Sequence, residues 1–187
     1  ILKARAADAL KQLAELCELP VVTTLMARGA FPDSHPLHLG MPGMHGNYTA
    51  VTAMQKSDLL ITLGARFDDR ITGRLEAFSP NSRKAHIDID PSSINKVIRV
   101  DLPIIGDVGH ILEDLLRIWK SRGRKVNREG HAAWWKQIDE WKSVNCLAFK
   151  DGGDIIKPQL AIQRLEALTK GMDRYITTEV GQHQMWA

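Results

Sequence analysis

Residues 57–73 read SDLLITLGARFDDRITG, and this stretch decides the fold class. Its apolar run, residues 59–63, is uninterrupted and ends at Gly64, which is typical of a strand buried on both faces of a parallel sheet. The loop that follows places two arginines and two aspartates within residues 66–70. We therefore expect an α/β domain in which a polar, ligand-binding loop follows a buried strand.

Helices and short strands alternate along the first 120 residues. Apolar residues at steps of three and four predict an amphipathic helix over residues 4–19, and the β-branched run at 21–24 predicts a strand. Further strands are expected at 85–89 and 103–105. Helices are expected at 47–56 and directly after Asp107, which can cap the second of them. This alternation predicts an open, mainly parallel sheet with flanking helices.

The last third of the chain has a different organisation. Residues 121–130 lack apolar periodicity and are typical of a solvated linker. A helix is expected at 131–149, with Trp134, Trp135, Ile138 and Trp141 near one face that docks on another surface. Pro158 is placed to begin a helix that runs to about residue 168, and residues 174–178 predict a strand. We expect a first domain at 1–120, a linker with a docking helix at 121–156, and the start of a second α/β domain at 157–187, in a chain truncated at both ends.

Composition excludes several classes of protein. The 25 basic and 22 acidic residues are interspersed, so the formal charge of +3 gives no reason to expect nucleic acid or an anionic membrane as partner. Cys17 and Cys146 lie far apart, which argues against a disulfide framework and a zinc site. No apolar run approaches the roughly 20 residues that span a bilayer. An intracellular location is therefore expected.

Three loops at strand ends carry candidate ligand-binding residues, because ligands bind outside the carboxyl ends of strands in open α/β sheets. In residues 64–73, the arginines suit phosphate or carboxylate; an internal salt-bridge network is the alternative. Residues 39–46 combine methionines, glycines and His45, which suits a flat apolar ring such as a flavin; a Met-rich core plug is the alternative. Asp88 suits ribose hydroxyl groups, with turn formation and helix capping as the alternative.

Together these segments resemble a known family. The stretches PVVTTLMARGAFPDSHPLHLGMPGMHG, SDLLITLGARFDDRITG, HIDIDPSSINK and PIIGDV resemble, in order and spacing, the catalytic subunit of acetohydroxyacid synthase. TTEVGQHQMWA resembles the start of the carboxyl-terminal thiamine diphosphate domain of that family. The resemblance covers essentially the whole chain.

The resemblance implies a three-domain subunit that condenses two 2-oxo acids and releases carbon dioxide, in the first step of branched-chain amino acid biosynthesis. The substrates would be pyruvate with pyruvate, giving 2-acetolactate, or pyruvate with 2-oxobutyrate. The cofactors would be FAD, thiamine diphosphate and Mg²⁺, with the magnesium ligands outside this chain. Homodimers, a regulatory small subunit, and a location in the bacterial cytoplasm or in the stroma or matrix of a eukaryotic organelle are also implied.

The same resemblance assigns the domains. Residues 1–120 would be the Rossmann-like FAD-binding central domain, with its first strand missing, and residues 157–187 would begin the thiamine diphosphate domain. The glutamate that activates the thiamine ring also lies outside the chain. We therefore expect the isolated chain to have no synthase activity.

Site residues follow by motif match. Those for FAD would be Thr24, Leu25, Met26, Met44, His45, Gly64, Arg66, Asp68, Arg70, Ile71, Asp88, Ile89, Gly106 and Asp107. Arg70 would also bind the carboxylate of the second 2-oxo acid, and Met44, Asp69 and Arg70 match contacts of sulfonylurea and imidazolinone herbicides. Those for the thiamine diphosphate would be Val180, Gly181, Gln182 and His183. Two alternatives remain: another thiamine enzyme of the glyoxylate carboligase, oxalyl-CoA decarboxylase or pyruvate oxidase type, and a non-catalytic nucleotide-binding module.

Overall fold

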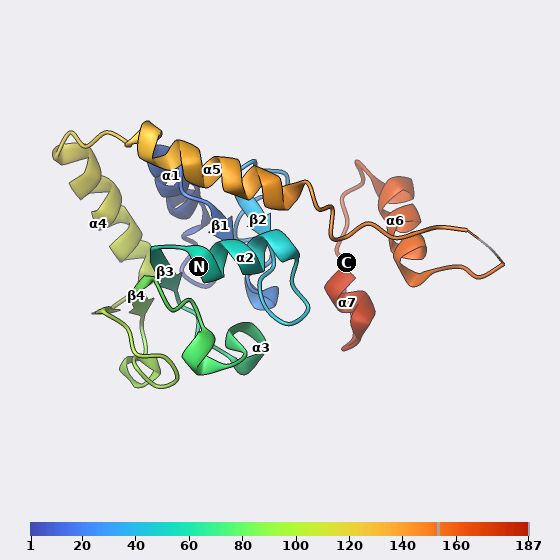
Figure 1. Ribbon diagram of the computed structural model, residues 1–187, viewed down its shortest axis with the longest axis horizontal. Helices are drawn as coiled ribbons and strands as arrows, with labels where there is room; N and C mark the ends of the chain where they lie inside the picture. Colours follow the sequence, from blue (N-terminus) through green and yellow to red (C-terminus); the bar gives the residue numbers. More distant parts are fainter. Residues whose placement is uncertain (153, 187) are drawn as a thin grey trace. The chain divides into compact units, whose positions relative to one another are not determined.

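The computed structural model describes residues 1–152 and 154–186. The chain divides into two compact units, Ile1–Val144 and Asn145–Ala187. The boundary falls within residues 121–156, the predicted linker. Among the residues that the structure describes, all strands belong to the first unit (Figure 1).

The strands form two parallel sheets. β1 (Val21–Val22) pairs with β2 (His38–Gly40). β3 (Leu59–Leu63), β4 (Arg83–Asp88) and β5 (Leu102–Ile105) form the second sheet in that order. The predicted α/β class with parallel strands is confirmed. β2 is a correction, because it lies in a stretch that the sequence predicted as an irregular loop.

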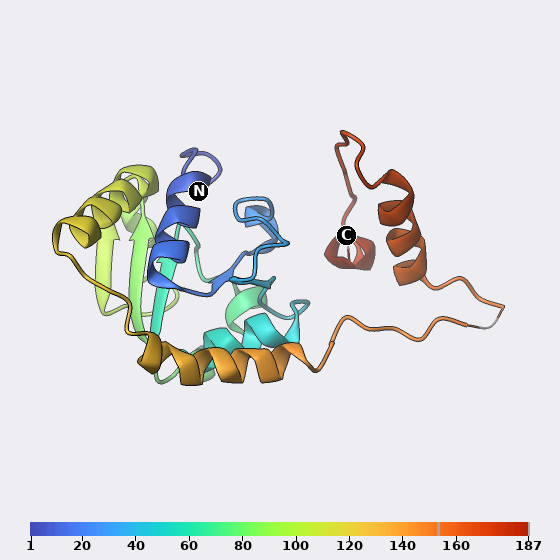
Figure 2. The same ribbon diagram turned by 90° about the horizontal axis from the view of Figure 1, so that it is seen from above.

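Helices flank the strands on two sides (Figure 2). On one side, α1 (Ala7–Cys17) packs against α4 (Val108–Ser121), and the buried Leu112 of α4 contacts Ile87 of the sheet. On the other side, α2 (Tyr48–Lys56) packs against α5 (Arg128–Lys142). The sheet therefore lies between two helical layers, with its strand ends free to carry loops.

The predicted start of α4 is confirmed, and the predicted start of α1 is wrong. Asp107 caps α4 as expected, because its Oδ1 accepts the backbone N–H of Gly109 at 2.8 Å. α1 begins at Ala7 and not at residue 4, since residues 2–5 form turns and Arg5 has a positive φ of 51°. A positive φ is incompatible with a right-handed helix.

Burial of β3 differs from the expectation. Leu59 is 52% and Ile61 is 40% exposed, so the strand is not buried on both faces along its whole length. The helical cover reaches only the carboxyl end of this face, where Leu63 and Ile104 pack against the cluster around Ile87. The apolar run predicted the strand correctly, but it also predicted more burial of the strand's side chains than the structure shows.

Helix α5 docks as its tryptophan pattern predicted. Ile138 is fully buried and forms a cluster with Ala50 and Ala53 of α2. Trp134 and Trp141 flank this cluster, with ring centroids 5.4 Å apart in an edge-to-face arrangement. The helix ends at Lys142, earlier than the predicted residue 149.

The second unit contains α6 (Pro158–Thr169) and α7 (Gln182–Trp186). The helix expected after Pro158 is confirmed. The strand expected at residues 174–178 is wrong, since these residues are irregular. A strand depends on hydrogen bonds to a neighbouring strand, and the described part of this unit contains none.

Short helical turns complete the described chain. They are α3 (Asp69–Thr72) and the 3₁₀ turns Leu25–Ala27, Leu75–Ala77 and Pro91–Ser93. Within residues 1–152 and 154–186, no helix combines the length and the apolarity that crossing a membrane requires.

Candidate cofactor-binding site

The strands β3, β4 and β5 end side by side, so the loops that follow them begin at the same edge of the sheet. The backbone N–H of Gly64 donates to the carbonyl of Ile87 at 2.8 Å, and that of Gly106 donates to the carbonyl of Asp88 at 2.9 Å. Because the strands are parallel, their carboxyl ends share one edge, where ligands of such sheets bind. Gly64, Asp88 and Gly106 therefore begin three neighbouring loops.

A fourth loop, residues 41–46, is fixed to the loop after β3. The backbone N–H of Met44 donates to the carbonyl of Arg70 at 2.7 Å. Gly43 has a φ of +104°, and a Cβ atom there would lie 2.6 Å from the Arg70 carbonyl oxygen. Asn47 then caps α2 by accepting the N–H of Ala50 at 2.7 Å. The two loops are therefore in direct contact at one edge of the candidate site.

Charged side chains in the loop after β3 pair with one another. Asp68 caps α3, and its carboxylate forms an ion pair with Arg66. The pKa of Asp68 is lowered, chiefly because the backbone N–H of Arg70 donates to its Oδ1 at 3.1 Å. Arg70 Nη1 lies 2.9 Å from Asp69 Oδ2. The salt-bridge alternative is thus realised in the structure.

These ion pairs do not bury the arginines. The side chains of Arg66 and Arg70 are 80% and 66% exposed. Exposed pairs of this kind contribute little to stability, because water screens both charges. An anionic ligand can therefore replace the aspartates as partner of either guanidinium group at little energetic cost.

Large apolar side chains are exposed in the loops of this edge. Met26, after β1, is 87% exposed; Met44 is 66% and Ile89, after β4, is 69% exposed. The alternative of a Met-rich core plug is wrong for Met44. Exposed apolar side chains among polar loops are typical of a binding surface.

Acidic residues at this edge have distinct roles. Asp107 accepts two N–H groups at the start of α4, and Asp90 accepts the N–H and hydroxyl of Ser92, which lowers the pKa of Asp90. The capping alternative therefore holds for both. Asp88 differs: its Oδ1 accepts the N–H of Asp90 at 2.9 Å, while Oδ2 faces His86 at 3.7 Å. Asp88 keeps acceptor capacity for a ligand.

The remaining predicted residues lie in several places. Thr24 and Leu25 are half-buried at the end of β1, His45 is exposed beside Met44, and Ile71 lies in α3. In the second unit, Val180 is 88% exposed, and Gly181 directly precedes α7, which Gln182 and His183 open. Among the described residues, no group of three or more His, Cys, Asp or Glu side chains could hold a metal ion.

A network around the buried side chain of His38 was not predicted from the sequence. His38 of β2 lies 3.0 Å from Thr23 Oγ1 through Nε2 and 3.3 Å from Asp33 Oδ1 through Nδ1. Its side chain is 3% exposed. The sequence LHLG, residues 37–40, gave no signal of this burial, because strand alternation places His38 on the face opposite the buried Leu39. The network joins β1, β2 and the loop between them.

This network predicts a pH dependence. Burial lowers the pKa of His38 below its ordinary value, against the smaller, opposite effect of Asp33. The unfolded chain, with a His pKa of about 6.5, therefore binds this proton more readily, and the stabilisation from neutral His38 is complete above that pH and decreases as pH falls. We expect thermal unfolding to show a steeper loss between about pH 7.5 and about pH 5.5 in the native protein than in His38→Asn.

The matched control for that measurement is His110→Gln, because His110 is exposed on α4. It should keep the pH dependence of the native protein. Equal pH dependence in the native protein and His38→Asn would contradict the prediction.

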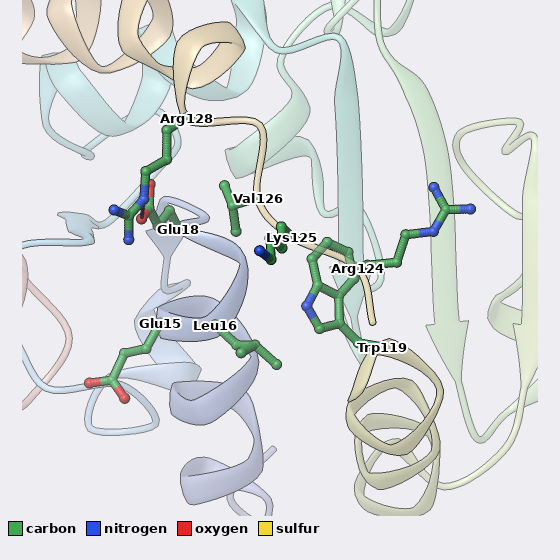
Figure 3. Close-up of a pocket in the computed structure, with 8 residues that line it drawn as sticks. All are labelled: Glu15, Leu16, Glu18, Trp119, Arg124, Lys125, Val126 and Arg128. Carbon is green, nitrogen blue, oxygen red and sulfur yellow. Dashed lines mark hydrogen bonds and ion pairs between the residues drawn. The ribbon is translucent and has the colours of Figure 1, made fainter. Parts of the chain in front are cut away.

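One cavity lies away from these loops. It measures about 540 Å³ and is lined by the carboxyl-terminal parts of α1 and α4 and the segment that joins α4 to α5. Figure 3 shows Arg128 turned to Glu18, its ion-pair partner at 2.9 Å, and Arg124 pointing away. None of the predicted site residues lines it. We assign it no ligand.

Comparison with known proteins identifies the family. Residues 1–115 match the family described as thiamine pyrophosphate enzyme, central domain. The chain belongs to this family. One relative is an acetolactate synthase of Mycobacterium avium, which is 46% identical over 188 residues. The matched region covers 100% of this chain and 30% of the length of the relative.

Two further relatives are named as large subunits. The acetolactate synthase isozyme 3 large subunit of Escherichia coli (strain K12) is 44% identical over 95% of this chain and 31% of its own length. The acetolactate synthase large subunit of Haemophilus influenzae is 43% identical over 98% of this chain and 32% of its own length. The chain thus spans about a third of the length of the curated relatives that it matches.

Proposed function

We propose that the chain is the central part of the large subunit of an acetolactate synthase. The full protein would condense pyruvate with pyruvate or with 2-oxobutyrate and release carbon dioxide. The observation that carries this proposal is the 46% identity to a protein of that name over the whole chain. The loops at the sheet edge supply the chemistry that the proposal requires.

FAD is the proposed ligand of this edge. Its flavin ring would lie against Met26 and Met44, whose exposed thioether side chains adapt to a flat apolar surface. Arg66 would hold its phosphates, Arg70 would contact it, and Asp88 would bind its ribose hydroxyl groups. Gly64 fits a close approach, because its φ is +63° and no atom lies within 4 Å of the position of a Cβ. The donor set and the open surface both fit the group.

The residues of this chain position substrates and do not break bonds. Thiamine diphosphate, when bound, supplies the electron sink for decarboxylation and carbon–carbon bond formation. Arg70 would bind the carboxylate of the second 2-oxo acid through its guanidinium fork. The side chains of Gln182 and His183 would donate hydrogen bonds to the diphosphate, with Val180 and Gly181 beside it. The magnesium ligands would lie outside the chain.

The proposed domain division places the FAD-binding domain at residues 1–120 and the start of the thiamine diphosphate domain at 157–187. Two sheet edges support a strand contributed from outside the chain. Within the described residues, β1 pairs only with β2, and β3 pairs only with β4. One further parallel strand between β1 and β3 would join the two sheets into one.

The proposal also includes partners. The full protein would form homodimers and bind a regulatory small subunit, and the term "large subunit" in the names of two relatives supports the second of these. The location would be the cytoplasm of a bacterium, or the stroma or matrix of a eukaryotic organelle.

The test uses the full-length protein. Its absorption spectrum should show bound flavin, and acetolactate formation from pyruvate should require both FAD and thiamine diphosphate. A protein that binds no flavin and forms no acetolactate would overturn the proposal. Reduction of the flavin by pyruvate without acetolactate formation would instead favour an enzyme of the pyruvate oxidase type.

A further inference from the structure

His86 of β4 is a buried polar residue that the proposed site does not use. Its side chain is 0% exposed, and neither ring nitrogen has a hydrogen-bond partner among the described residues. A buried polar group without a partner is costly, and native proteins retain few of them. Its surroundings therefore indicate what the imidazole is for.

Two binding loops meet at this imidazole. Nε2 lies 3.7 Å from Oδ2 of Asp88, which is two residues along the same strand and so on the same face of the sheet. The ring also packs edge-to-face against Phe67, with centroids 5.0 Å apart. Phe67 belongs to the loop of Arg66 and Arg70, and its positive φ of 56° turns it into the core. His86 thus lies between Phe67 of the loop after β3 and Asp88, the last residue of β4.

We propose that His86 is a positioning residue for Asp88, and this rests on the proposed binding of FAD at the sheet edge. With a proton on Nε2, the imidazole donates to Asp88 Oδ2 when a ligand hydroxyl group engages this carboxylate. The present separation is slightly longer than a hydrogen bond, so a small rotation of either side chain closes it. Asp88 Oδ1 is already held by the N–H of Asp90. Both oxygens are then fixed, with lone pairs left for vicinal hydroxyl groups.

Two opposite effects follow from this arrangement. His86→Leu removes a donor to a charged acceptor, so FAD affinity should fall about tenfold. The same variant removes unsatisfied buried polar atoms, so the unfolding temperature of the FAD-free protein should stay the same or rise. A purely structural histidine would not separate the two measurements in this way.

Three further variants identify the path of the effect. His86→Gln keeps an N–H donor and should restore affinity to within about threefold of the native value. In an Asp88→Ala background, His86→Leu should change affinity less than about twofold, because the residue through which His86 acts is gone. Phe78→Leu is the packing control: Phe78 packs against Phe67 and is not among the proposed binding residues, so the substitution should lower stability and leave FAD affinity nearly unchanged.

The experiment is a fluorescence titration of the full-length protein with FAD, paired with thermal unfolding without FAD. Native affinity in His86→Leu would overturn the role of His86, and so would equal losses in the presence and absence of Asp88. If the native protein itself binds no FAD, the proposed FAD site is wrong. That outcome is distinct from one in which the native protein binds FAD and only the role of His86 is wrong. Parallel titration with riboflavin, which lacks the adenosine ribose, should show no effect of His86→Leu; an equal loss for riboflavin would contradict the assignment to Asp88.

Discussion

Arg70→Ala should lower kcat/KM of the full-length protein for acetolactate formation roughly 100-fold, because a charge-assisted pair to a carboxylate is lost. The Arg70 side chain is 66% exposed, and Asp69, at 2.9 Å, is its only side-chain partner among residues 1–152 and 154–186. Its remaining guanidinium N–H groups have no partner within the described residues, so they can form a two-pronged contact with a substrate. The measurement is the dependence of acetolactate formation on pyruvate concentration.

The comparison with lysine separates charge from geometry in this prediction. Arg70→Lys keeps the positive charge but has no planar fork, so it should recover only a minor part of the lost kcat/KM. Arg74→Ala is the matched control, because Arg74 is an exposed arginine in the segment just after α3. Full activity in Arg70→Ala, or an equal loss in Arg74→Ala, would remove Arg70 from the substrate site.

Which loops form the site could be predicted from sequence. A continuous apolar run and short β-rich segments separated by helices indicate parallel strands, and the carboxyl ends of parallel strands share one edge. The loops beginning at Gly64, Asp88 and Gly106 could therefore be grouped by their positions after predicted strands. The cap at Asp107 could also be predicted, because a carboxylate directly before a helix commonly accepts the free N–H groups of its first turn.

Features that depend on distant pairing could not be predicted in the same way. β2 has three residues in a region rich in glycine and proline, and it becomes a strand only through pairing with β1. Residues 174–178 have β-branched and aromatic side chains but remain irregular, because the described second unit provides no strand beside them. Strand propensity reflects neighbours more than the backbone itself.

Contacts between the loops could not be predicted from the sequence either. The glycines and methionines of residues 39–46 suggested a surface for a flat ring, and the exposure of Met44 agrees with that use. The hydrogen bond from Met44 N to the Arg70 carbonyl joins backbone atoms, which no side-chain pattern encodes. His86 was unassigned because its burial between Phe67 and Asp88 depends on the packed sheet.

The bond between these two loops gives the last prediction, which concerns Gly43→Ala. At a φ of +104° an alanine is strained, and its Cβ would lie 2.6 Å from the Arg70 carbonyl oxygen and 2.9 Å from Ile71 Cδ1. Backbone atoms cannot move aside as a flexible side chain can. We expect the free energy of unfolding to fall by about 3 kcal/mol. Because the two loops must separate to admit the Cβ atom, FAD should bind at least tenfold more weakly.

Gly29→Ala is the matched control for this substitution. Gly29 also has a positive φ, of +83°, but no atom lies within 4 Å of the position of its Cβ. It should carry only the backbone strain, about 1–2 kcal/mol, with nearly native affinity for FAD. Because the two variants share the strain and differ in the clash, the difference in FAD affinity measures how far binding depends on the contact between the loops. Equal affinities would show that the flavin tolerates their separation, and the two loops would then have to be treated as independent parts of the site.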